Sequence, residues 1–278
     1  MKFPIGIQDF KKVITEDYLY IDKTALIYQL VKGGSIYFLS RPRRFGKSLL
    51  VSTLEYYFKG ERELFKGLAI DALEKDWKSY PVFHVDFNGT NFTEAGALQG
   101  IVKGLVESWE KQYGFQPNTD YTYGQRFCEL LAHVHHTTGK RCVVLIDEYD
   151  KPLLDVMDTD YKMEMNGEMR LIEDCNRETL KGFYSTFKAA DAHLQFVLLT
   201  GVTKFSQVSV FSGFNQPMDI SMNRQYDAIC GITKDELITQ LDEPVANMAL
   251  ALGLDKEEMI ERLVKQYDGY HFSRGMVD

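Results

Sequence analysis

Cysteine is scarce in this chain of 278 residues, and the few cysteines are far apart. The sequence contains no C-x-x-C pair, the spacing from which zinc sites and redox dithiols are usually recognised. It therefore predicts neither kind of site, and it favours a reducing, cytoplasmic location. The four cysteines are Cys128, Cys142, Cys175 and Cys230.

Long apolar runs are also missing. No stretch approaches the roughly 18 uncharged residues that a membrane-spanning helix needs. The N-terminal sequence MKFPIGIQDF reaches Pro4 and Asp9 without the apolar centre of a secretory signal. We therefore expect a cytoplasmic protein without a targeting segment and without a membrane partner.

The third absence is an excess of basic charge. The chain has 32 lysines and arginines against 40 aspartates and glutamates, which gives a formal net charge of -8. A domain that binds DNA or RNA over a broad surface is usually basic. The composition excludes such a surface for the chain as a whole, although a local basic spot is compatible with it.

What the chain does contain is enough apolar sequence for a large core, since 45% of its residues are hydrophobic. Four runs rich in β-branched and aromatic residues predict buried strands. Apolar residues recur at helical spacing in residues 49–57 and 127–134. Strands that alternate with helices predict an α/β fold with a mainly parallel sheet covered on both faces. The strand candidates are IYFL from Ile36, VFHVDF from Val82, CVVLID from Cys142 and FVLLTG from Phe196.

The C-terminal part of the chain has a different pattern. TKDE at 233 and DKEE at 255 each place a capping residue three positions before a glutamate, which is typical of a helix start. We therefore predict a core over residues 1–230 and a helical segment over residues 231–278, with Gly231 as the hinge.

Residues 156–178 show no clean period. Their sequence, VMDTDYKMEMNGEMRLIEDCNRE, mixes methionine with alternating charges. Two interpretations stay open. The segment is a mobile insertion or partner surface, because methionine adapts to varied contacts, or it is a solvated loop that leads into a helix.

The stretch SRPRRFGKSLL, residues 40–50, joins a predicted strand to a predicted helix. In the motif G-x-x-x-x-G-K-[ST], the second glycine lets the backbone approach a phosphate, the lysine reaches the β- and γ-phosphates, and the hydroxyl coordinates magnesium. These residues would be Gly46, Lys47 and Ser48. As a bare tripeptide, GKS could equally belong to a basic surface turn.

Arg41 stands where this motif has its first glycine. Pro42 could compensate, because its fixed φ favours a tight bend. We further expect Arg41, Arg43 and Arg44 to bring positive charge toward the phosphates.

A second half of the site follows the third predicted strand, where CVVLIDEYD ends in Asp147 and Glu148. In nucleotide hydrolases, the first acid of such a pair holds magnesium through water and the second polarises the attacking water. Parallel strands end at one edge of a sheet, so the acids and the loop would share a crevice. An acidic pair alone is usually a solvated strand end, but both halves together predict nucleotide binding.

Thr200 closes the fourth predicted strand. Its hydroxyl could lie between the loop and the acidic pair, where it would position water or sense the γ-phosphate. The alternative is a simple turn residue.

Five stretches of the sequence together resemble the bacterial and archaeal AAA-ATPase-like proteins, and the resemblance covers nearly the whole chain. Arginine at the first-glycine position is the usual form in that family. The five stretches are YIDKT at 20–24, SRPRRFGKSLL at 40–50, LIDEYD at 145–150, LTGVTKFSQVSVFSGFNQPMDIS at 199–221 and YDGYHFS at 267–273.

The resemblance implies a three-layer P-loop NTPase core of the catalytic-glutamate type, with Walker A and Walker B motifs and a helical lid. ATP and Mg2+ are the cofactors it implies. Relatives of this kind commonly continue into a PD-(D/E)XK nuclease domain. Nucleic acid is therefore expected as a partner only through a domain absent from this chain, which itself shows no nuclease constellation.

The predicted site divides into three roles. In YIDKT, Asp22 could hold the base or ribose, or the stretch could be an ordinary N-terminal segment. The catalytic candidates are Lys47, Glu148 and Thr200, and the magnesium ligands are Ser48 and Asp147. The nucleotide-binding candidates are Asp22, Arg43, Arg44, Phe45, Gly46, Lys47, Ser48 and Leu49.

Two other clusters could carry chemistry, but a structural interpretation is favoured for each. HVHH at 133–136 lacks a Glu or Cys at a useful spacing for zinc, so it reads as a polar helix end. Five aromatic residues could stack nucleobases, but with few neighbouring basic residues they favour core packing. These five are Tyr113, Phe115, Tyr121, Tyr123 and Phe127.

The sequence thus predicts a Mg-dependent ATPase whose nucleotide cycle moves a lid. The alternative is a module that binds nucleotide without hydrolysing it and presents an interaction surface. Hydrolysis needs a cation that stabilises the charge on the transferred phosphoryl group. A neighbouring subunit or a partner protein could supply this cation. The arginine candidates are Arg43, Arg44, Arg170, Arg177, Arg224 and Arg262.

Overall fold

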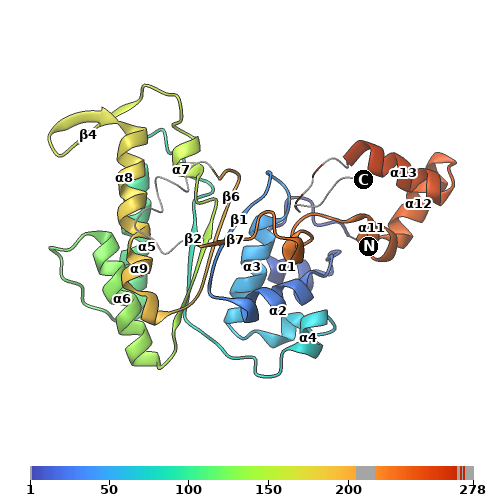
Figure 1. The fold of residues 1–278 in the computed structure, drawn as a ribbon, viewed down its shortest axis with the longest axis horizontal. Helices are drawn as coiled ribbons and strands as arrows, with labels where there is room; N and C mark the ends of the chain where they lie inside the picture. Colours follow the sequence, from blue (N-terminus) through green and yellow to red (C-terminus); the bar gives the residue numbers. More distant parts are fainter. Residues whose placement is uncertain (1, 205–216, 268–269, 271, 273–278) are drawn as a thin grey trace.

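The computed structural model describes residues 2–204, 217–267, 270 and 272. Parts of two family-like stretches, within 199–221 and 267–273, lie outside the described residues, as does part of the predicted lid segment. The described chain forms a helix–sheet–helix sandwich with a further group of helices beside it (Figure 1).

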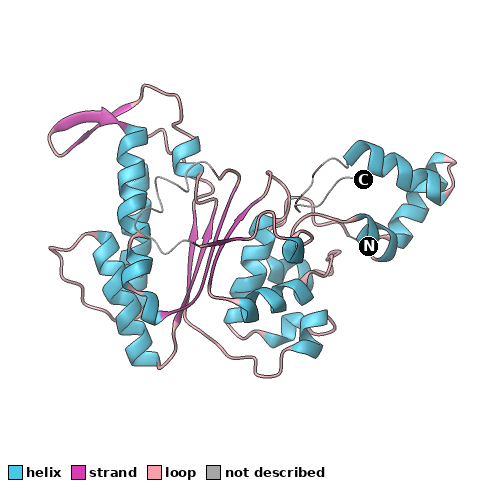
Figure 2. Ribbon diagram, in the orientation of Figure 1, coloured by secondary structure: helices cyan, strands magenta, loops and turns pink. Residues whose placement is uncertain are grey.

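The central sheet has five strands in the order β2-β3-β6-β1-β7, and every neighbouring pair is parallel. It runs through the middle of the molecule between two helical layers (Figure 2). The predicted α/β class, the parallel sheet and the four long strands are confirmed. The strands are β1 (Ile36–Ser40), β2 (Val82–Asp86), β3 (Cys142–Asp147), β6 (Leu194–Gly201) and β7 (Met218–Asp219).

Both faces of the sheet are buried, which explains why its strands read as continuous apolar runs. Successive side chains of a strand point to opposite faces. In β3, Val144 and Ile146 join one core cluster, whereas Val143 and Leu145 join the other. The sheet is therefore a central layer with an apolar core on each side.

One face is covered by α5, α6, α8 and α9, and the opposite face by α1 to α4 (Figure 1). The helical patterns at 49–57 and 127–134 fall in α3 and α6 and are confirmed. On the first face the helices are α5 (Ala97–Gln112), α6 (Tyr123–Thr138), α8 (Ile172–Tyr184) and α9 (Thr186–Ala189). On the second face they are α1 (Phe10–Thr15), α2 (Thr24–Gly33), α3 (Lys47–Phe58) and α4 (Ala69–Leu73).

Short 3-10 turns lie at residues 62–65, 191–193 and 224–226, and the short helix α7 (Lys151–Leu154) follows β3. None of the helices in the described ranges combines the length and apolarity required to cross a bilayer.

The helices α11 (Lys234–Thr239), α12 (Asp242–Leu252) and α13 (Lys256–Tyr267) lie apart from the sandwich (Figure 1). The two predicted helix starts are present. Thr233 and Glu236 form a reciprocal capping box, and Asp255 accepts a hydrogen bond from the backbone N–H of Glu258. These helices bury an apolar cluster of their own, against which Leu19 and Ile21 also pack.

Residues 156–178 contain an antiparallel hairpin, β4 (Lys162–Met165) and β5 (Glu168–Leu171), followed by α8. The second interpretation, a solvated loop that leads into a helix, was correct about the helix. It was wrong about the loop, because β4 and β5 form a hairpin there. The strands were missed because these short strands contain no buried side chain, and their sequence alternates methionine with charge instead of forming an apolar run. Met169 is 65% exposed.

Candidate nucleotide site at the carboxyl edge of the sheet

The strand ends bring the two sequence motifs to one edge of the sheet. The strand β6 lies between β1, which leads into the phosphate-loop motif, and β3, which leads into the acidic pair. The register pairs Ser40 with Gly201 and Asp86 with Asp147. The carboxyl ends of all four long strands are therefore level, and loops that follow them meet in one region.

The phosphate-loop motif turns sharply before α3. Gly46 has φ 86° and precedes the first helical residue, Lys47. An added Cβ would meet no atom within 4 Å, so glycine is needed here for its left-handed backbone and not for space. Arg44 also adopts positive φ. The N-terminal turn of a 12-residue helix thus faces the edge where an anion would be stabilised by free N–H groups.

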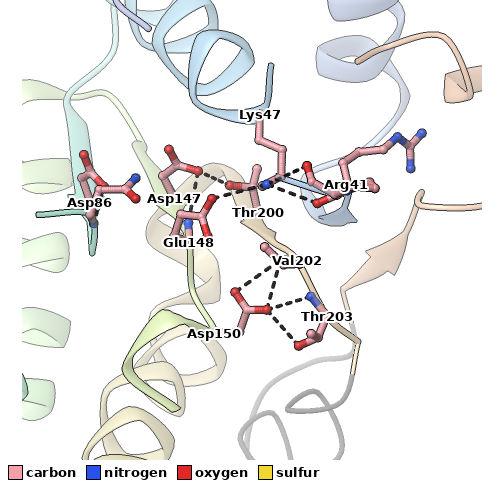
Figure 3. Close-up of polar contacts among 11 residues, drawn as sticks. Arg41, Lys47, Asp86, Asp147, Glu148, Asp150, Thr200, Val202 and Thr203 are labelled. Atoms are coloured by element: carbon pink, nitrogen blue, oxygen red, sulfur yellow. Dashed lines mark hydrogen bonds and ion pairs between the residues drawn. The ribbon is translucent and has the colours of Figure 1, made fainter. Parts of the chain in front are cut away.

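The ammonium group of Lys47 is buried among oxygen atoms (Figure 3). It donates to the carbonyl oxygens of Arg41 at 3.1 Å and Pro42 at 3.3 Å. It also lies 3.3 Å from Oε1 of Glu148. The structure therefore brings the predicted phosphate-binding lysine and the predicted catalytic glutamate into direct contact.

Asp147 and Thr200 form a second contact beside this pair (Figure 3). The Thr200 hydroxyl donates to Oδ1 of Asp147 at 2.5 Å, and both side chains are buried. The backbone N–H of Glu148 donates to the same oxygen at 3.1 Å. Thr200 thus lies on the strand between the loop and the acidic pair, and it fixes the orientation of the Asp147 carboxylate.

Glu148 combines an unusual backbone with a shifted carboxyl group. It has φ 54°, a region that non-glycine residues rarely adopt and that is often found at functional sites. Burial raises the pKa of its carboxyl above the ordinary value, and this effect exceeds the lowering by the Lys47 charge. A raised pKa suits a carboxylate that accepts a proton during reaction.

A buried interlock that sequence analysis missed joins the tips of β3 and β6 (Figure 3). The carboxylate of Asp150 accepts hydrogen bonds from the N–H of Val202 at 3.0 Å and from the N–H of Thr203 at 2.7 Å. The Thr203 hydroxyl adds a third at 2.8 Å. The acid at the end of LIDEYD was the available sequence signal, but the groups that donate to it lie in a distant part of the chain.

The same interlock leaves no room for a side chain at Gly201. A Cβ there would lie 2.4 Å from the ring of Tyr149 and 2.7 Å from Oδ1 of Asp150. Tyr149 donates its backbone N–H to the Thr200 carbonyl and its hydroxyl to the Thr203 carbonyl. Gly201 is therefore required by close approach, which holds Thr200 against Asp147.

Arg41 does not point toward the phosphate site, so the expectation that it supplies charge there was wrong. Its side chain is 1% exposed, and its guanidinium donates to the Ser221 carbonyl at 2.7 Å. Further contacts reach the carbonyls of Tyr226 and Asp227, both at 3.3 Å. Burial lowers the pKa of Arg41. The residue ties the loop to the segment after β7.

The remaining loop residues lie around Lys47. Arg43 and Arg44 are exposed, and Ser48 and Leu49 are half-buried in the first turn of α3. The carbonyl of Phe45 accepts from the N–H of Gly231 at 3.0 Å.

Asp22 is engaged elsewhere. Its Oδ1 accepts from the N–H and the hydroxyl of Thr24, and its Oδ2 accepts from the N–H of Ala69. Its own N–H donates to the side chain of Gln240, the residue that follows α11. The carboxylate therefore caps α2 and α4, and no hydrogen bond within the described ranges joins Asp22 to the site edge.

The donor set fits magnesium, which takes oxygen ligands and keeps several waters. Asp147 and the Ser48 hydroxyl provide such oxygens. Oδ1 of Asp147 accepts from Thr200 and Glu148, whereas no described group donates to Oδ2, so this oxygen would be available to a magnesium ion. The described part of the chain contains no group of three or more His, Cys, Asp or Glu side chains arranged to hold a metal.

The histidine cluster and four of the five aromatic residues take the structural roles that were favoured, whereas core packing was wrong for Tyr121, which is 39% exposed. Nδ1 of His135 lies 3.0 Å from Nδ1 of His193 at the end of α6. Phe127 is fully buried, and Tyr113, Phe115 and Tyr123 pack against the same core.

Comparison with known proteins places these observations in a family. A family model described as predicted AAA-ATPase matches residues 4–211. A protein of Azotobacter chroococcum mcd 1, described as an uncharacterized protein in the vnfD 5'region, is 40% identical over 274 residues. That match covers 98% of this chain and 49% of the relative, so the chain spans about half the relative's length. No solved structure matches. The matched model covers most of the chain and both halves of the candidate site, and the chain therefore belongs to the predicted AAA-ATPase family.

Proposed function

We propose that this chain binds ATP with Mg2+ at the carboxyl edge of its sheet and hydrolyses it. The observation that carries the proposal is the 3.3 Å contact between Lys47 and Glu148, beside the 2.5 Å hydrogen bond from Thr200 to Asp147. A cation, a metal-binding acid and a base are thereby gathered within one region. Lys47 begins α3, whereas Asp147 ends β3 and Glu148 follows it directly.

Lys47 and the start of α3 bind the triphosphate. The ammonium group is a compact charge that exchanges carbonyl and carboxylate partners for phosphate oxygens of higher charge. The free N–H groups of the first helical turn and the left-handed backbone at Gly46 add donors without side-chain obstruction. The exposed Arg43 and Arg44 sit in the same loop.

Ser48 and Asp147 hold the magnesium ion. When bound, the metal neutralises phosphate charge and stabilises the charge that develops during transfer. The protein's part is orientation. Thr200 donates to one carboxylate oxygen of Asp147, which directs the other oxygen outward.

Glu148 orients the attacking water and accepts its proton as the bond from water oxygen to phosphorus forms and the bond to the leaving ADP oxygen breaks. Its raised pKa gives the carboxylate greater basicity than an exposed glutamate. The backbone hydrogen bond from Glu148 to Asp147 fixes the two acids relative to each other.

We also propose that residues 231–278 act as a lid that responds to the nucleotide. Three features support it: α11 to α13 bury their own apolar cluster, Gly231 has φ 84°, and the Gly231 N–H donates to Phe45 in the loop. The buried Lys23 and the half-buried Glu236 form an ion pair between the N-terminal segment and α11. Lys23 of the YIDKT stretch thereby connects the N-terminal segment to the lid.

The second candidate is a nucleotide-dependent interaction module without hydrolysis. It is favoured by the surroundings of the arginine candidates. Arg170 and Arg177 pair with glutamates of α8, and Arg262 pairs with a glutamate of α13. Arg43 and Arg44 are then the arginine candidates of this chain that lie nearest to Lys47 in the sequence. A second copy of the chain or a partner protein would supply any further arginine at the site.

Phosphate release separates the two candidates. The purified chain is titrated with ATP in the presence and absence of magnesium, with binding read by the rise in melting temperature and turnover read as phosphate. We expect Glu148→Gln to keep binding and to lower turnover at least about 100-fold. Glu164→Gln, at an exposed glutamate of β4, is the control and should match the parent chain. Turnover unchanged by Glu148→Gln refutes the proposed mechanism, and binding without phosphate release by the parent chain favours the second candidate.

A further inference from the structure

Both ends of the phosphate-loop motif contact one aromatic side chain near the C-terminus, Phe272. The Arg41 guanidinium carbon lies 4.0 Å from the centre of the Phe272 ring. The Phe45 ring lies 5.5 Å from Phe272 at an interplanar angle of 83°. Phe272 therefore bridges the first residue of the motif and the residue before Gly46, although it lies far away in the sequence.

Phe45 is held from several sides. Tyr270 contacts its ring edge to face, with centroids 4.7 Å apart at 71°, and Tyr270 and Phe272 are themselves nearly parallel at 6.1 Å. An added Cβ at Gly231 would lie 3.2 Å from Phe45 Cδ1. The residue is thus wedged between the proposed hinge and the C-terminal aromatic pair.

These contacts have a physical basis beyond proximity. Arg41 is buried, and within the described residues its Nε has no hydrogen-bond acceptor. A buried guanidinium that lacks one of its hydrogen bonds is compensated when it stacks on an aromatic face. Edge-to-face aromatic pairs add further stabilisation. The arginine that replaces the first glycine of the loop therefore has a structural role, because its guanidinium stacks on the ring of Phe272.

We infer that Phe272 is a positioning residue for the phosphate loop. By packing on Arg41 and Phe45 together, it holds the two ends of the loop in the conformation that presents Gly46 and Lys47 to a nucleotide. Because Phe272 follows α13 closely, a displacement of the lid helices would be transmitted to the loop through this contact. The inference deepens the proposed function and rests on it for its consequence, which is tighter nucleotide binding.

Trypsin tests the contact without any nucleotide. Arg43 and Arg44 are exposed within the loop, so cleavage after them reports how often the loop opens. We expect Phe272→Ala to accelerate cleavage at these two bonds about 5-fold or more, whereas Phe272→Tyr keeps the ring and behaves like the parent chain. Tyr267→Ala is the matched control, because Tyr267 is 68% exposed on the same segment. Equal cleavage of Phe272→Ala and the parent chain overturns the inference.

Nucleotide affinity tests the consequence. In calorimetric titrations of ATP with magnesium, we expect Phe272→Ala to bind about 5-fold more weakly, with Phe272→Tyr and Tyr267→Ala unchanged. A Phe272→Ala chain whose loop opens faster but whose affinity is unchanged refutes a positioning role. If the parent chain itself binds no ATP, the proposed function fails, while the trypsin result still decides whether Phe272 holds the loop.

Discussion

The ammonium group of Lys47 lies 3.3 Å from the carboxylate of Glu148, although the two residues belong to loops that follow different strands. The strand β6 separates β1 from β3, so the contact crosses the width of a strand at the carboxyl edge. Sheet topology thus produces the pairing. The following predictions depend on this arrangement and on the contacts that support it.

Replacement of Lys47 should remove nucleotide binding. Lys47→Ala deletes the buried ammonium group that the proposal assigns to the phosphates. Charged hydrogen bonds are worth about 1.5–3 kcal/mol each, so ATP affinity should fall about 100-fold or more. Lys59→Ala is the control, since Lys59 follows the same helix but is 43% exposed and pairs with Glu55. Calorimetric titration measures both, and equal affinity in the two variants contradicts the assignment.

Thr200 should be needed for its hydroxyl. Thr200→Val keeps the shape but removes the hydroxyl that donates to the buried Asp147, which leaves only the backbone N–H of Glu148 as its donor and costs about 1–3 kcal/mol of unfolding free energy. Thr200→Ser restores the donor and should recover most of that loss. Urea unfolding gives the stability, and the magnesium concentration needed for ATP binding gives the effect on the site. If Thr200→Val and Thr200→Ser give the same result in both measurements, the Thr200–Asp147 contact does not have this role.

Gly201 should not tolerate a methyl group. A Cβ at this position would lie 2.4 Å from the Tyr149 ring, so Gly201→Ala forces the β3–β6 interlock apart at a cost of about 1–3 kcal/mol or more. Gly104→Ala is the matched control, because a Cβ in this part of α5 meets no atom within 4 Å. The control should be neutral or stabilise the chain by up to about 1 kcal/mol. Equal melting temperatures for the two alanine variants would refute the close approach.

The rate of hydrolysis should rise with pH on the acid side because of Glu148. Burial raises the pKa of this carboxyl, although Lys47 opposes the shift. The base form required for water activation therefore accumulates as pH increases through the raised pKa, and is lost as pH falls. Phosphate release by the parent chain should show this acid limb. A residual rate in Glu148→Gln that keeps the same limb assigns the titration to another group.

The His84–Glu55 pair should make stability depend on pH in a defined window. Burial alone would lower the pKa of His84, but the hydrogen bond that its ring donates to the Glu55 carboxylate, 2.8 Å away, raises it above the ordinary value. Burial alone would raise the pKa of Glu55, but His84 and Lys59 lower it to about 2. The His84 contribution is present below the unfolded pKa of about 6.5 and is lost as pH rises through the folded value. The Glu55 contribution is present above about 4.5 and is lost as pH falls toward the folded value.

The variant Glu55→Gln should therefore destabilise the chain more at pH 5.5 than at pH 8.5, by about 1 kcal/mol. Urea unfolding at the two pH values measures the difference. The exposed Lys11–Glu61 pair supplies a control in Glu61→Gln, which should cost little at either pH. A Glu55→Gln penalty that is the same at both values excludes the ion pair.

Sequence patterns were sufficient to predict the strands that are buried on both faces. The strands β1, β2, β3 and β6 were predicted because side chains on both of their faces enter a core. The hairpin β4–β5 and the edge strand β7 were not, because short exposed strands have no apolar run. Helix starts at Thr233 and Asp255 were predictable from local capping chemistry.

The candidate site could be predicted only where its chemistry is local in sequence. Lys47 and Glu148 lie in motifs that specify their own backbone. The functions of Arg41, Asp150 and Phe272 depend on contacts with remote segments, such as Ser221, Thr203 and Arg41 itself. No spacing rule connects such residues. Close approach at Gly201 is likewise visible only once Tyr149 has been placed in space.

The measurement that tests the central claim most directly is a crystal structure of Glu148→Gln with ATP and magnesium. The substitution should keep the nucleotide intact for the experiment. We predict that the triphosphate lies along residues 41–48, with a phosphate oxygen within hydrogen-bond distance of the Lys47 ammonium group. We predict the metal beside Ser48 and Asp147. A nucleotide bound elsewhere, or a loop that stays empty at saturating ATP while the fold is intact, would contradict it.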